Sequence, residues 1–464
     1  MKRVGENIMI NNQQRPIDVK VGIKPVCANW HISPWEGIVM KEISTEEAQK
    51  RFDKSVEDLK NNLPEEATVL KPVFIERGEC ISKKEDEELK NDLQNVDLFL
   101  PYSFGAWGGG YTAVQLGQKY KKPVVSSPEI VANLRSRNLE GYVALDRNEL
   151  NYLISLLQVR KAVNQTKMLI VSEGLLPRDV SDNIWDLEGI RTRFGADYQS
   201  ISLVEFFNEM DRVIQDTDEQ KRAEDIADKL IKNAQKVHID RRYVIKSISF
   251  YIAAKNLMGI YGCNAFTIPC CDTIPNTMAT KRKIVPCLTH TLLKDEGIPS
   301  ACQYDITSLL TMMFLMYISK KSACMGNSSY DLNKNTIRLW HDVPGLKMHS
   351  LNKPDLPYEL RNFTPSGWGT NVRYDFARDK GEKVTLARFN PLATKILVAK
   401  GEIVGCENFN KIGCSLAADI EVPDVRELIH KLADFGVHLV MVYGDYTQKL
   451  KELGKLMKFE VTEV

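Results

Sequence analysis

The sequence predicts an α/β protein with two doubly wound parallel-sheet domains on its N-terminal side and a β-rich, barrel-like domain on its C-terminal side. Up to about residue 296, short apolar strand-like segments alternate with longer amphipathic helical segments. This βαβ pattern builds parallel sheets with helices on both faces. Further along the chain, short strand-like segments and turns dominate, which is typical of an antiparallel barrel or sandwich. The expected domains are residues 1–143, 144–296 and 297–464.

Composition limits the classes of function. The chain has 464 residues with 62 Lys and Arg against 61 Asp and Glu, a net charge of +1 that argues against nucleic-acid partners and polybasic membrane anchors. No segment has the length of a transmembrane helix, and the N-terminus lacks the apolar core of a signal peptide. The ten cysteines form no disulfide framework and no CxxC pair. We therefore expect a cytoplasmic protein with no nucleic-acid or membrane partner.

The first expected domain contains a glycine-rich turn with several possible roles. The turn, residues 105–110, follows a strand and opens a helix, and open α/β sheets place ligands at this end of their strands. It lacks the GxGxxG spacing of dinucleotide-binding proteins. A substrate-facing loop and a plain tight turn both fit, with phosphate binding a weaker alternative. Strands are expected at 19–26, 69–75, 96–101 and 123–125, and helices at 45–62, 83–95 and 112–120.

The second expected domain repeats the same alternation. Strands are expected at 168–172, 198–203 and 263–270, and helices at 148–162, 180–194, 218–234, 241–261 and 285–296. The heavy charge of residues 205–236 has regular apolar spacing, which is typical of a solvated helix face.

An almost uninterrupted apolar run at residues 306–317 opens the third domain. It is too short to span a membrane and too long for most strands, so we expect a buried helix. Asp305 stands directly before it, where a carboxylate caps backbone N–H groups. Strands are then expected at 335–341, 383–389, 395–399, 401–404, 418–422 and 438–443, and helices at 424–435 and 446–457.

Six phrases of the sequence resemble, in the same order, those of the L-fucose isomerase-like family. The segment 297–317 resembles the family's "GIP-x-ACE-x-D-x-x-GALTM" phrase. The other matching segments are 264–270, 285–287, 335–341, 381–402 and 437–445. The resemblance implies the three-part fold described above and the interconversion of an aldose and a ketose with a divalent metal, most often manganese. It also implies a homo-trimer or homo-hexamer in which a neighbouring subunit helps to complete each site.

The resemblance further implies roles for individual residues. Asp305 matches a metal-binding carboxylate and His438 a histidine ligand. The family's glutamate that binds metal and moves protons falls near Asp272, although Thr273 could occupy its place. Asp305 and Asp272 are thus the expected catalytic carboxylates, because a carboxylate beside a metal suits proton transfer from carbon.

Other side chains are candidates for sugar binding. Trp340 and His341 close an expected strand, and Gln303 lies beside Asp305. Trp30 and His31 form an early aromatic cluster that could stack on a sugar or pack at an interface. Four cations could hold an anionic group of the substrate or could be ordinary surface charges: Arg373, Arg378, Lys380 and Arg388.

The sequence also departs from the family pattern, which leaves two alternative functions open. Gln303 replaces a glutamate and Val437 replaces the first histidine of a pair. A sugar-binding or regulatory protein that has lost catalysis is therefore the first alternative. A thiol-dependent or NAD-linked enzyme is the second, suggested by the adjacent Cys270 and Cys271, although small buried side chains explain this pair as well.

Overall fold

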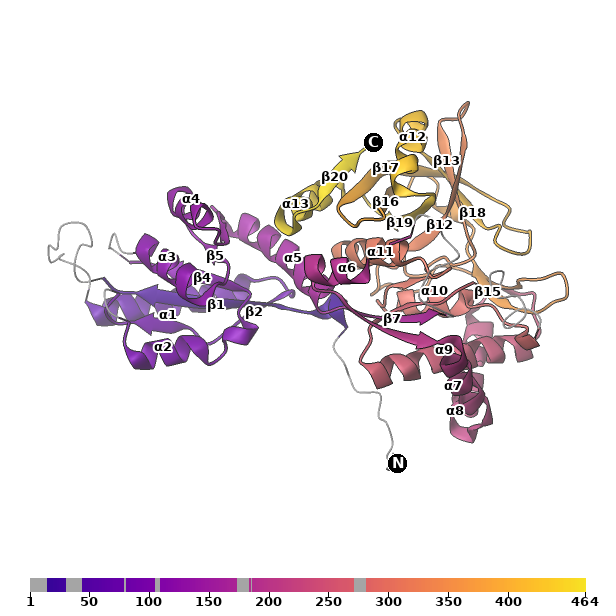
Figure 1. The fold of residues 1–464 in the computed structure, drawn as a ribbon, viewed down its shortest axis with the longest axis horizontal. Helices are drawn as coiled ribbons and strands as arrows, with labels where there is room; N and C mark the ends of the chain where they lie inside the picture. Colours follow the sequence, from indigo (N-terminus) through magenta and orange to yellow (C-terminus); the bar gives the residue numbers. More distant parts are fainter. Residues whose placement is uncertain are drawn as a thin grey trace. The chain divides into compact units, whose positions relative to one another are not determined.

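The computed structural model describes residues 15–30, 44–78, 81–104, 109–172, 183–184, 186–270 and 281–464. His31, Cys271, Asp272 and Thr273 lie outside the described residues. The chain forms two compact units, a smaller one of Asp18–Lys161 and a larger one built mainly of Ala162–Val464. The expected three-domain division stays a prediction, and Figure 1 shows the elements of both units.

The smaller unit is the expected doubly wound α/β domain. Its strands are all parallel in the order β2-β1-β4-β5-β6, and β3 also pairs with β1. They are β1 (Val21–Ala28), β2 (Ala67–Val69), β3 (Val73–Ile75), β4 (Leu98–Tyr102), β5 (Val124–Val125) and β6 (Gly141–Tyr142). The single strand expected at 69–75 is divided in two, because Pro72 between the halves has no N–H for the ladder.

Helices cover both faces of this sheet. They are α1 (Thr45–Asn62), α2 (Lys83–Lys90), α3 (Gly109–Tyr120), α4 (Pro128–Ser136) and α5 (Arg147–Asn164), the last of which crosses the boundary between the units. Consecutive residues of a strand face opposite sides. Accordingly, Cys27 packs against Phe52 of α1, whereas Val26 belongs to the cluster that contains Leu116 of α3 and Leu134 of α4.

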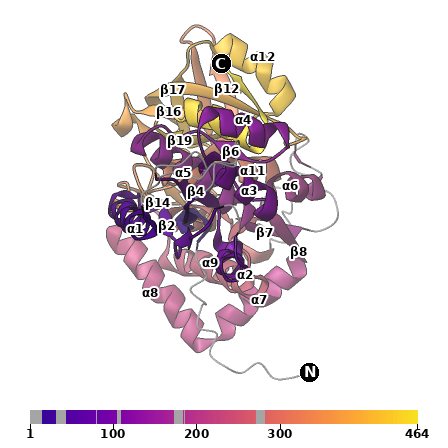
Figure 2. The same cartoon turned by 90° about the vertical axis from the view of Figure 1, so that its left-hand side faces the viewer.

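The larger unit begins with a second parallel sheet, in the order β11-β10-β7-β8. Its strands are β7 (Lys167–Ser172), β8 (Asp197–Ser202), β10 (Ala265–Thr267) and β11 (Ser300–Ala301). Its helices are α6 (Leu187–Phe194), α7 (Leu203–Gln215), α8 (Thr217–Asn233), α9 (Arg241–Tyr261) and α10 (Cys287–Asp295). Figure 2 shows α7 and α8 diverging from a common end, and both pack on α9. A small sheet joins β9 (Lys236–Val237), β14 (Glu359–Asn362) and β15 (Thr370–Arg373).

The β-rich part of this unit closes into a six-stranded antiparallel barrel. Neighbouring strands pair in the order β16-β19-β12-β13-β18-β17, and β17 returns to β16. The strands are β12 (Cys324–Asp331), β13 (Thr336–Trp340), β16 (Lys383–Phe389), β17 (Lys395–Glu407), β18 (Ala417–Glu421) and β19 (His438–Tyr443). Helices α12 (Val425–Phe435) and α13 (Thr447–Met457) and the parallel strand β20 (Glu460–Glu463) complete it. The barrel expectation is confirmed.

Helix α11 (Ile306–Ser319) forms the centre of the larger unit. It packs against β10 and β11 of the parallel sheet and against β16 and β19 of the barrel (Figure 1). Every residue from Ile306 to Ile318 is buried, as expected of a helix whose residues are mainly apolar on every side. Within the described part of the chain, no helix combines the length and apolarity required to cross a membrane.

Candidate active site

The connection from β11 to α11 is a tight turn with an unusual backbone. Gln303 and Tyr304 have φ values of 61° and 57°, in the left-handed region that residues other than glycine rarely adopt. Such conformations persist only where the surroundings enforce them, and they concentrate at functional sites. The side chain of Asn183 enforces this one: it donates to the Tyr304 carbonyl and accepts from the N–H groups of Ile306 and Thr307.

Asp305 directly follows this turn and has two roles in the structure. Its Oδ1 accepts the N–H of Ser308 at 2.8 Å, so the residue is the N-cap of α11, as expected. Its Oδ2 lies 2.8 Å from Nδ1 of His438, a residue 133 positions away in the sequence. The same oxygen accepts from Ser308 Oγ at 2.6 Å and from Arg388 Nη1 at 3.1 Å. The fold therefore brings the two expected metal ligands into direct contact.

The charge of Asp305 follows from these contacts. The side chain is fully buried, and burial alone raises a carboxyl pKa. The positive charge of Arg388 and the hydrogen bond from His438 outweigh that effect and hold the pKa of Asp305 well below its usual range. The carboxylate is therefore ionised at neutral pH, so it can only accept hydrogen bonds.

His438 is the first residue of β19 and contacts a second polar partner on the neighbouring strand. It lies directly opposite Asn327 of β12, and its Nε2 is 2.8 Å from Asn327 Oδ1. Asn327 is in turn opposite Trp340 of β13. Gly326 permits this close pairing, because a Cβ there would lie 2.8 Å from the carbonyl oxygen of Trp340. The three polar or aromatic side chains thus occupy one row across three adjacent strands.

His341 brings two further expected residues into the same cluster. Its Nε2 is 3.3 Å from Gln303 Oε1, and its ring centroid is 6.1 Å from that of His438. Burial, followed by the neighbouring His438, lowers the pKa of His341 to about 4. The ring is therefore neutral at pH 7, a form that can both donate and accept a hydrogen bond.

Two of the four cations considered for an anionic substrate group lie in the interior. Arg373 is fully buried, pairs with Asp342 at 2.7 Å and donates to the carbonyls of Asn408 and Gly413. Arg388 is likewise fully buried against Asp305. The interpretation of these two as surface charges is wrong, and the internal acceptors that they contact leave little capacity for a substrate anion. Both arginines instead balance a buried carboxylate.

The remaining expected site residues lie elsewhere. Trp30 belongs to the smaller unit, where it is buried, donates through Nε1 to Thr112 Oγ1 at 3.0 Å and packs against Tyr111. It is thus a core residue of that unit, and its contact with a sugar in a neighbouring subunit stays a prediction. His31 and Asp272 lie outside the described residues.

Burial keeps several cysteines of the described segments in the unreactive thiol form. Cys270 is buried. Its hydrogen bond to Cys302, together with burial, raises the pKa of Cys302 well above its usual range. Burial does the same to the pKa of Cys287. Because the thiolate is the reactive form, these thiols are poor nucleophiles, and the thiol-dependent alternative gains no support from them.

The Asp305–His438 pair fits a divalent cation in part. A carboxylate oxygen and an imidazole nitrogen 2.8 Å apart are near the spacing of about 3 Å that adjacent ligands have in an octahedral site with bonds of about 2.1 Å. The charge is less favourable, since Arg388 already balances Asp305. Among the described residues, no group of three or more His, Cys, Asp or Glu side chains could hold a metal. A cation here would need a further carboxylate, and the expected Asp272 lies outside the described residues.

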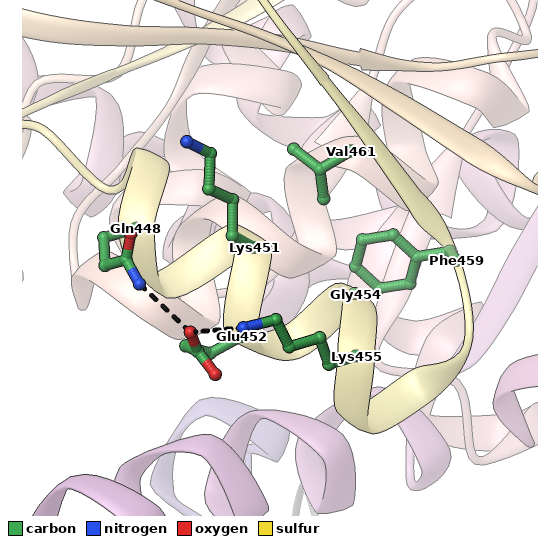
Figure 3. A pocket seen from close by; sticks show the side chains of 7 residues that line it. All are labelled: Gln448, Lys451, Glu452, Gly454, Lys455, Phe459 and Val461. Carbon is green, nitrogen blue, oxygen red and sulfur yellow. Dashed lines mark hydrogen bonds and ion pairs between the residues drawn. The ribbon is translucent and has the colours of Figure 1, made fainter.

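Figure 3 shows a surface pocket of the larger unit, and it is separate from this cluster. The pocket lies at α13 and β20, and its lining contains none of the expected site residues. Two of its polar side chains, Gln448 and Lys455, are hydrogen-bonded to Glu452. The buried cluster around Asp305 therefore remains the better candidate for the site.

Three side chains of the cluster were not anticipated from the sequence: Asn183, Ser308 and Asn327. Ser308 had a detectable signal, because it stands three residues after an N-cap carboxylate, where a hydroxyl can return a hydrogen bond. Asn327 lies in a strand of mixed, partly exposed residues that the apolar pattern does not mark. Asn183 accepts a hydrogen bond from the N-terminus of α11, more than a hundred positions away in the sequence, and no local pattern reveals such a contact.

Comparison with known proteins bears on the expected enzyme class. The chain is 24% identical over 467 residues to sulfoquinovose isomerases of Priestia aryabhattai and Priestia megaterium, covering 90% of this chain and 96% of each relative. It is 28% identical over 224 residues to a sulfoquinovose isomerase of Alkalicoccus urumqiensis, covering 46% of each chain. No family model matches the chain, so membership of the L-fucose isomerase-like family is not confirmed. The expectation of an enzyme of the aldose–ketose isomerase type is confirmed at this distant level of similarity.

Proposed function

We propose that this protein is a sugar isomerase that interconverts a sulfonated aldose, such as sulfoquinovose, with the corresponding ketose. The observation that carries the proposal is the buried contact between Asp305 Oδ2 and His438 Nδ1 at 2.8 Å. These are the two residues that match metal ligands in the family that the sequence resembles. The names of the relatives support the choice of substrate.

Isomerisation moves a hydrogen between C1 and C2, so it requires a base for carbon and a donor for the substrate oxygens. Asp305, which stays ionised, lies 2.8 Å from Nδ1 of His438 and so orients that ring. His341, which is neutral, can hydrogen-bond a sugar hydroxyl beside Gln303. Because the pKa of Asp305 is held low, it is a weak base, and we assign proton transfer at carbon to a second carboxylate, Asp272.

The proposed isomerase depends on a divalent metal, with manganese as the first choice. Asp305 and His438 would hold the ion together with Asp272. When bound, such a cation polarises the substrate oxygens at C1 and C2 and so stabilises the charge that develops between them.

We further propose that the enzyme is a homo-trimer or homo-hexamer whose site includes residues of a neighbouring subunit. Trp30 and His31 are the residues assigned to that contribution. Sedimentation analysis tests this directly: a stable and fully active monomer would contradict it.

A substrate comparison tests the proposed function. Metal-free protein receives manganese, and conversion of aldose to ketose is measured with sulfoquinovose and with quinovose, the same sugar without its sulfonate. We expect conversion of sulfoquinovose only with the metal, and weak or no conversion of quinovose. Equal conversion of both sugars would refute the sulfonated substrate, and no conversion of any aldose in the presence of manganese would refute the isomerase.

A further inference from the structure

Arg388 contacts three separate elements around the candidate site. From its position near the end of β16, its Nε donates to the carbonyl of Phe435 at 2.6 Å, at the end of α12. Its Nη1 donates to the carbonyl of His438 at 2.8 Å, to Ser308 Oγ at 2.9 Å and to Asp305 Oδ2 at 3.1 Å. The side chain is fully buried. One planar guanidinium thus joins the end of α12, the start of β19 and the N-terminus of α11.

These contacts fix both members of the Asp305–His438 pair relative to the same rigid group. The contacts with the carbonyls of Phe435 and His438 set the backbone from which the imidazole projects. The contact with Asp305 Oδ2 sets the carboxylate, and Ser308 Oγ bridges the two side chains, since it donates to Asp305 and accepts from Arg388. A guanidinium can do this because its donors have a fixed planar geometry, which the flexible ammonium of lysine lacks.

The orientation of the imidazole follows from the contacts of its two ring nitrogens. Its Nδ1 lies 2.8 Å from Asp305 Oδ2, and its Nε2 lies 2.8 Å from Asn327 Oδ1. A histidine ring that a carboxylate contacts at one nitrogen is held in one orientation, which is how proteins prepare imidazoles for metals and substrates.

We propose that Arg388 is a positioning residue that assembles Asp305 and His438 into a pre-aligned pair before a cation or a sugar arrives. The assignment of this pair to the reaction rests on the proposed function. The pre-alignment itself concerns the metal-free protein alone. The two claims can therefore fail separately.

The experiment compares Arg388→Lys with Arg373→Lys in metal-free protein labelled with ¹⁵N at histidine. Arg373 is the matched control, because it is also fully buried, paired with a buried aspartate and bonded to backbone carbonyls, but it does not contact Asp305 or His438. His438→Gln assigns the ring signals. We expect a single set of His438 ring signals in the wild type and in Arg373→Lys, and a second set or shifted signals in Arg388→Lys.

Turnover gives an independent readout once manganese is added. A positioning role predicts that Arg388→Lys lowers kcat by on the order of 10- to 100-fold while KM changes little, since small misplacements of reacting groups have effects of this size. Wild-type ring signals in Arg388→Lys would overturn the proposal. If that variant does not fold, Ser308→Ala decides, because it removes only the bridging hydroxyl: a second His438 population supports the proposal, and an unchanged spectrum overturns it. A wild type with ordered ring signals but no isomerase activity would refute only the proposed function.

Discussion

The buried ion pair between Asp305 and Arg388 makes a quantitative prediction about stability. Both side chains are fully buried, so removing one leaves an uncompensated charge in the interior. Asp305→Asn introduces an amide that can still cap α11, so the change in capping contributes only a few tenths of a kcal/mol to the loss of stability. The unpaired guanidinium should lower the free energy of unfolding by about 3–5 kcal/mol. Arg388→Met should cost a similar amount, because it leaves the carboxylate unpaired.

The double variant separates this reasoning from a simple loss of packing. When both charges are absent, neither is left unpaired, so Asp305→Asn with Arg388→Met should be more stable than the sum of the single effects predicts, by up to about 3 kcal/mol. The assay is urea denaturation, with hydrogen exchange of the α11 amides to isolate the larger unit. Strictly additive effects of the two substitutions would refute the claim that the pair acts as an electrostatic unit.

Three further predictions concern neighbouring features. Burial lowers the pKa of His341 to about 4 and that of His290 to about 3, so at acid pH the unfolded chain binds protons that the folded chain cannot. The free energy of unfolding should therefore fall as pH drops below about 6.5, and His290→Asn should reduce this slope by up to about 1.4 kcal/mol per pH unit. A free energy of unfolding that does not change with pH in the wild type would contradict this prediction. Gly326→Ala should destabilise the protein by about 1–3 kcal/mol in thermal denaturation, because its Cβ would meet the backbone of Trp340. Gly259→Ala on α9 is the control and should not destabilise it, since the space around Gly259 is open. Equal effects of the two substitutions would refute the close approach of β13 to Gly326. Gln303→Glu should raise the pKa of His341 and tighten manganese binding in calorimetry, and unchanged affinity would place residue 303 outside the metal site.

Much of the fold follows from local patterns. The helix at 306–319 and the strand that begins at His438 both stand out as mainly apolar segments, and nearly all of their residues are buried. The closure of the barrel was expected only in outline. Strand β12 was missed because its outer half is exposed and polar, and β17 was expected as two strands although it is continuous from Lys395 to Glu407.

The site shows where reasoning from the sequence stops. Asp305 carries a local signal as a helix cap, but its second contact, with His438, depends on how β19 packs beside α11. A charged residue in a strand is expected at the surface, and only the fold reveals that Arg388 lies inside with acceptors on three elements. Long-range pairing of this kind has no periodic signature in the chain.

The central claim is that the Asp305–His438 pair is the reaction centre of a sugar isomerase. The most direct test is exchange of the C2 hydrogen of sulfoquinovose in deuterated water, followed by proton NMR with manganese present. His438→Gln, shown to be folded by its hydrogen-exchange pattern, is compared with the wild type. The account predicts rapid loss of the C2 signal with the wild type and a loss slowed by on the order of 100-fold or more with the variant. Exchange at the same rate in both proteins would contradict it.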